Sequence, residues 1–127
     1  MKLAYELEKL CKVCVSHFEE LCEKDKERIF VFSISLDSQS IWGGNGDRDT
    51  DSLYYITKDG WKEETIVQEF GMYQKGDGIK SDSIKAVTSK DVESIINGDI
   101  ATIRDIKQFL EFYDRIHDNY INDFKSY

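Results

Sequence analysis

The spacing of apolar residues changes along the chain, and this change restricts the fold more than any other feature. From about residue 2 to residue 24, apolar side chains recur at steps of three and four, the period of an amphipathic helix. The segment IFVFSISLD, residues 29–37, is instead rich in β-branched and aromatic residues. We therefore expect a helix over 2–24 and then a strand, central in its sheet because both strand faces begin with apolar residues.

The middle of the chain predicts an antiparallel meander. A turn at residues 37–39 leads to a short strand that carries Ile41 and Trp42, and the composition of GGNGDRDTD, residues 43–51, predicts a loop. SLYYIT and WKEETIV follow as two strands of a hairpin, because Asp59-Gly60 suits a type I′ turn. Residues 70–78 contain three glycines and predict an irregular connection, and SIKAV is a further short strand.

The last third of the chain predicts two helices. Thr88 is the expected N-cap of a short helix, with Asp91 at its third position and Asn97-Gly98 at its end. Asp99 is the expected N-cap of a longer helix to about residue 124. Its predicted apolar stripe consists of Ile103, Ile106, Leu110, Tyr113, His117, Tyr120 and Phe124. The predicted fold class is α+β: an N-terminal helix, an antiparallel meander of three to five strands, and C-terminal helices packed on one sheet face.

Size and charge limit the kinds of partner. With 127 residues the chain has the size of one domain, so we expect a single domain over 1–127. Aspartate and glutamate number 25 against 17 lysine and arginine, a net charge of −8. This excess disfavours nucleic acid, whose phosphates require clustered lysine and arginine, and favours a basic protein partner.

The N-terminus and the cysteines predict a cytoplasmic protein. Charged residues interrupt MKLAYELEKLCKV, so it does not read as a signal peptide, and no stretch is apolar enough for a membrane span. Cys11, Cys14 and Cys22 are an odd number of thiols in one segment, which indicates reduced cysteines.

Two patterns resemble metal sites without meeting their requirements. Cys11, Cys14 and His17, with Cys22, fall on one predicted helix, and ligands on one straight helix cannot surround a tetrahedral zinc ion. We therefore expect core packing for these cysteines.

The triplet Asp47-x-Asp49-x-Asp51 resembles the start of an EF-hand loop. Ser52 stands where that loop needs glycine, and Lys58 stands where it needs the bidentate glutamate. A solvated acidic loop is the prediction, and weak cation binding is the alternative. His17 and His117 show no catalytic partner in the sequence, and we predict no catalytic residue, metal or cofactor.

Aromatic and acidic residues of the predicted sheet form the candidate surface for a protein partner. Trp42 and Trp61 are the expected anchors, because desolvated aromatic side chains dominate binding energies. The expected steering and contact groups are the carboxylates of Asp47, Asp49, Asp51, Asp59 and Glu63.

The order of these segments resembles a known group of proteins. An N-terminal helix, a meander that contains IFVFSISLD and SLYYITKDGW, and C-terminal helices resemble the small acidic immunity proteins of polymorphic or contact-dependent bacterial toxin systems. The resemblance implies a cytoplasmic inhibitor that binds and neutralises one cognate toxin domain, often a basic nuclease. It assigns no role to any single residue. The alternatives are a non-catalytic adaptor or homodimeric interaction module, and an enzyme or metal-dependent module that uses the Asp47–Asp51 segment or the Cys11/Cys14 pair.

Overall fold

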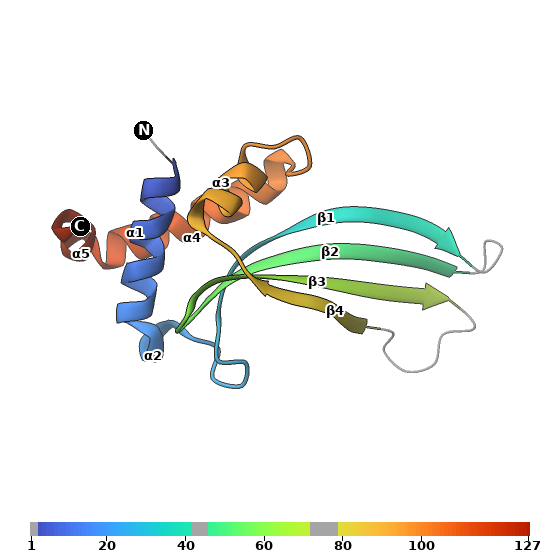
Figure 1. The fold of residues 1–127 in the computed structure, drawn as a ribbon, viewed down its shortest axis with the longest axis horizontal. Coiled ribbons are helices and arrows are strands. Elements are labelled where there is room, and N and C mark those ends of the chain that lie inside the picture. The colour runs from blue at the N-terminus through green and yellow to red at the C-terminus, as the bar shows by residue number, and fades with distance from the viewer. Residues whose placement is uncertain (1–2, 42–45, 72–78) are drawn as a thin grey trace.

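A computed structural model describes residues 3–41, 46–71 and 79–127. Its elements are α1 (Leu3–Ser16), α2 (Phe18–Leu21), β1 (Ile29–Ile41), β2 (Gly46–Thr57), β3 (Gly60–Gly71), β4 (Ile79–Ala86), α3 (Ser89–Ile96), α4 (Ile103–Asn119) and α5 (Ile121–Ser126). The four strands form one antiparallel sheet in the order β1-β2-β3-β4. In the part of the chain that the structure describes β1 is therefore an edge strand, and the expectation that it would be central was wrong, because α4 covers its apolar residues where a second neighbouring strand was expected. The predicted α+β class is confirmed. The helices gather at one end of the open sheet, and the strands extend well beyond them (Figure 1).

The N-terminal helical segment is shorter than predicted and is broken. α1 ends at Ser16, His17 has non-helical backbone angles, and α2 ends at Leu21. The expectation of one helix over 2–24 was therefore wrong in its continuity and its end. Cys22 is already extended, and a bridge between Glu23 and Arg28 turns the chain into β1.

Two segments predicted as turn or loop belong to long strands. β1 continues through residues 37–39 without a turn, and register shifts at Phe30/Phe32 and Ser35/Asp37 absorb the irregularity as bulges. β2 begins at Gly46, so residues 47–51 are strand and not loop. Pairing with β1 on one side and β3 on the other outweighs the low strand propensity of aspartate.

The β2–β3 hairpin lies where the sequence predicts it, with a different turn. Thr57 pairs with Gly60, so Lys58 and Asp59 are the two central residues. The positive φ falls on Gly60, at 112°, where a type I′ turn would need it at both central residues. The predicted short strand SIKAV lies at the end of the longer strand β4, except for its last residue, Val87.

The C-terminal helices begin with capping boxes. Thr88 caps α3 with Asp91 as predicted, whereas α4 is capped by Thr102 with Asp105, and the expectation of an Asp99 cap was wrong. The predicted long helix also divides at Tyr120 into α4 and α5.

The buried stripe of α4 is shifted from the predicted one. Ile103 is 87% exposed, while Phe109, Phe112 and Ile116 are buried against the sheet and α1. The phenyl ring of Phe109 meets Phe32 of β1 edge-on, and Phe32 stacks on Tyr54 of β2. The core therefore lies between the helices and the adjoining end of one sheet face.

Candidate functional site

Three of the predicted contact residues form a row on β2. Asp47, Asp49 and Asp51 alternate along a regular strand, so their side chains project from the same sheet face. Asp49 accepts a hydrogen bond of 2.7 Å from the Ser38 hydroxyl on β1. We name these three residues the acidic row.

The acidic row lies on the sheet face opposite the core. Tyr54 and Ile56 of β2 are buried on the core face. Side chains alternate between the two faces along a strand, so the odd-numbered residues of β2, which include the acidic row, point to the opposite face. On this second face, Asp51 is paired across the ladder with Ile66, and Asp49 with Gln68. We call it the open face.

β4 completes the open face with apolar side chains. Ile84 is paired with Glu64 and Ile79 with Gln68, and these two isoleucines are 59% and 49% exposed. The open face thus combines carboxylates on β2 with exposed apolar groups on β4, a combination that suits a protein partner better than a small ligand.

The other predicted contact residues lie elsewhere. Asp59 is in the β2–β3 turn, and about 3.3 Å per strand residue puts that turn roughly 33 Å along β2 from Asp47. Glu63 lies on the core face, where its carboxylate accepts a 2.6 Å hydrogen bond from the Tyr54 hydroxyl and pairs with Lys85 at 3.4 Å. Burial and this bond to Glu63 raise the pKa of Tyr54 well above its ordinary value. Trp42 lies outside the described residues.

Trp61 is a core residue, and its predicted role as a surface anchor was wrong. Its side chain is 3% exposed, and the indole N–H donates a 3.3 Å hydrogen bond to the Leu7 carbonyl of α1. The alternation of β3 places it beside Ile56 on the core face. An aromatic residue at a strand start has the same sequence signature whether it is covered by a helix or by a partner.

The acidic row is not arranged as a cation site. Side chains two residues apart in a strand project about 6.6 Å apart, too far to converge on one ion held at ~2.4 Å. Within residues 3–41, 46–71 and 79–127, no three metal-ligating side chains are grouped suitably to hold a metal.

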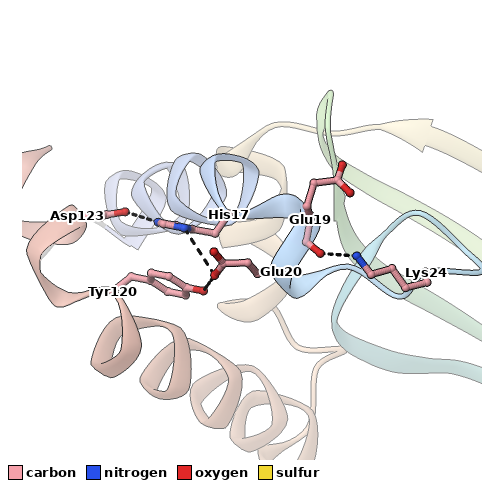
Figure 2. Close-up of polar contacts among 6 residues, drawn as sticks. All are labelled: His17, Glu19, Glu20, Lys24, Tyr120 and Asp123. Carbon is pink, nitrogen blue, oxygen red and sulfur yellow. Dashed lines mark hydrogen bonds and ion pairs between the residues drawn. The ribbon is translucent and has the colours of Figure 1, made fainter.

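A cluster that the sequence did not predict surrounds His17. The His17 Nε2 atom lies 2.6 Å from Asp123 of α5, and its ring stacks on Tyr120 with 4.0 Å between centroids. The Tyr120 hydroxyl donates a 2.7 Å hydrogen bond to Glu20 of α2 (Figure 2). More than one hundred residues separate His17 from Asp123, so no local spacing could have indicated the pair.

The geometry of this cluster favours a structural role. Asp123 occupies one ring nitrogen of His17, Glu20 is 4.0 Å from the other, and Tyr120 covers a ring face. A general base needs a free nitrogen within hydrogen-bond reach of a substrate. The contacts instead fasten α5 to the break between α1 and α2.

We expect His17→Ala to loosen α5. The variant loses a charge-assisted contact and a ring stack, and we expect a loss of about 1–2 kcal/mol in the free energy of unfolding. Amide hydrogen exchange over residues 121–126 should accelerate more than exchange in β2. Asp118→Ala is the control, because it removes a carboxylate from a second histidine–aspartate pair, His117–Asp118. That pair is long, at 3.8 Å, and the Asp118 side chain is 80% exposed. Equal exchange in both variants would contradict the fastening role.

The cysteines divide into two inert thiols and one accessible thiol. All three are free; Cys11 and Cys14 are buried, and Cys22 is partly exposed. Burial raises the pKa of Cys11 to about 11 and that of Cys14 to about 12. Both groups therefore stay protonated at neutral pH and pack as apolar side chains.

This division predicts the order of thiol modification. With Ellman's reagent near pH 8, we expect Cys22 to react first and Cys11 and Cys14 to react at least ~10³-fold more slowly, because they must wait for unfolding. Cys22→Ser should remove the fast phase. If all three cysteines of the folded protein reacted at the same rate, Cys11 and Cys14 would have to be accessible, and the prediction would be wrong.

The fold and site define an α+β domain with an open sheet and an acidic row on the sheet face opposite the core. Comparison of the chain with protein-family models, with curated proteins and with solved structures found no match. Among the helices that the structure describes, none has the length and apolar character to cross a membrane.

Proposed function

We propose that this chain is a cytoplasmic immunity protein that binds a cognate toxin domain with a basic surface, for instance a nuclease, and neutralises it without catalysis. The acidic row on the open face is the observation that supports this proposal most. Its three carboxylates project in one direction, and β4 of the same sheet adds exposed apolar groups of the kind that fill interface centres.

The net charge of −8 supports the same partner class. Carboxylates on one face attract a cationic partner over a Debye length of about 10 Å and speed its approach. A nuclease domain carries cationic groups for its polyanionic substrate, so a row of fixed carboxylates competes for those groups.

The edges of the sheet favour a heterologous partner over a homodimer. β4 carries Lys80 and Lys85, and a register shift at Thr65/Ile66 bulges the strand. Lysine and bulges on an edge strand oppose strand-to-strand pairing between copies. On β1, Gln108 of α4 already accepts a 3.1 Å hydrogen bond from the Ser33 N–H.

The test begins with the protein encoded beside this chain. If that protein has a toxic C-terminal domain, co-expression of this chain should restore growth. The association rate of the purified pair should fall steeply as salt rises. Failure to protect, or an association rate indifferent to ionic strength, would contradict the proposal. Light scattering that shows a stable dimer with no heterologous binding would instead support the homodimeric module.

A further inference from the structure

A hollow lined by lysines lies at the opposite end of the sheet from the acidic row. It has a volume of about 520 Å³ and lies between the connection from α2 to β1 and the β2–β3 turn. Four lysines line it: Lys24, Lys26, Lys58 and Lys62. We call it the lysine hollow.

The positive charge of this hollow runs against the composition of the chain. Acidic residues outnumber basic ones by 25 to 17 overall, yet four ammonium groups here face the three carboxylates of Glu19, Glu27 and Asp59. Glu19 pairs with Lys58 at 3.1 Å, and its carbonyl accepts a 2.5 Å hydrogen bond from Lys24 (Figure 2). Lys26 and Lys62 have no ion-pair partner in the part of the chain that the structure describes.

Backbone hydrogen bonds hold two of these lysines in place. The Glu23 N–H donates to the Arg28 carbonyl at 2.8 Å, and the Lys26 and Glu27 N–H groups donate to the Glu23 carbonyl. Glu27 adopts a left-handed backbone with φ 51° to close this turn. Lys24 and Lys26 are thereby presented from a fixed loop toward the hairpin that carries Lys58 and Lys62.

We propose that the lysine hollow binds a chain of linked phosphate groups, either free polyphosphate or the phosphate chain of a nucleotide. Lysine ammonium groups are compact point charges that contact phosphate oxygens from several directions. The lysines of the hollow come from a loop, a turn and a strand, so their positive charge is spread over more space than one phosphate group fills. Glu27 and Asp59 also line the hollow and repel any anion. The favoured ligand therefore has several linked phosphate groups, which can contact several lysines at once and outweigh this repulsion. This site does not depend on the proposed function.

The test is calorimetric titration of sodium tripolyphosphate into the full chain at low ionic strength. We expect saturable binding with a Kd below about 1 mM, and at least a ~10-fold weaker Kd for the K26A/K62A variant. The K90A/K125A variant is the control, because it also loses two positive charges, from exposed positions on α3 and α5. Circular dichroism should confirm that both variants are folded.

Each outcome decides the proposal. Weakening confined to K26A/K62A supports the site, and a parallel titration with ATP identifies the source: equal affinity indicates free polyphosphate, and tighter binding indicates a nucleotide. No saturable binding, or equal weakening in both variants, which indicates an adventitious ion only, overturns it.

Discussion

Replacing Trp61 with alanine is expected to lower the free energy of unfolding by about 3–5 kcal/mol, a large part of the ~5–15 kcal/mol of a typical domain. The indole is 3% exposed and packs between the sheet and α1, so the truncation leaves a cavity. It also removes the hydrogen bond to the Leu7 carbonyl. Chemical denaturation followed by circular dichroism measures the change.

Two variants separate the causes of this loss. Trp61→Phe keeps an aromatic ring but removes the N–H donor, and we expect it to cost about 1–2 kcal/mol. Tyr5→Ala removes an aromatic side chain that is 55% exposed on α1, and we expect a change below ~0.5 kcal/mol. If Trp61→Ala were as mild as Tyr5→Ala, Trp61 would have to be a surface group after all.

Removing the acidic row is expected to slow binding to the proposed basic partner by about 10- to 100-fold at low salt. In the D47N/D49N/D51N variant the side chains keep their shape, and three negative charges are lost from the open face. The dissociation rate should change less, because steering acts mainly before contact. Stopped-flow association at rising salt provides the measurement.

A charge-matched variant is needed to interpret that result. D25N/D99N/D114N loses the same charge from exposed positions outside the sheet and should bind nearly as fast as the unmodified protein. The difference between the two variants should vanish at high salt, where exposed charges are screened. If both variants slowed association equally, net charge and not the acidic row would attract the partner.

Much of the fold could be predicted because local chemistry fixes it. The three- and four-residue spacing in α1, the β-branched run of β1, the Thr88–Asp91 capping box and the position of the β2–β3 hairpin all depend on residues close in sequence. Helix ends were predicted less well. Both Asp99 and Thr102 have the chemistry of an N-cap, and only the backbone path showed that Thr102 has the role.

The candidate site was predicted only in part, because exposure is a property of packing. Asp47, Asp49 and Asp51 were expected on a loop, and pairing on both sides made them a strand with one common direction. Trp61 and Glu63 have the composition of binding residues, but α1 covers Trp61, and Tyr54 and Lys85 bind Glu63. The prediction had grouped residues that the sheet separates by most of its length.

By itself, the sequence determined the class of fold, the acidic balance and the single-segment clustering of the thiols, because these follow from residue spacing and composition. Only the tertiary structure decided which carboxylates share a face, that Trp61 is covered, and that His17 meets Asp123. The reason is physical: periodicity acts over a few residues, whereas burial and long-range pairing depend on which distant segments meet.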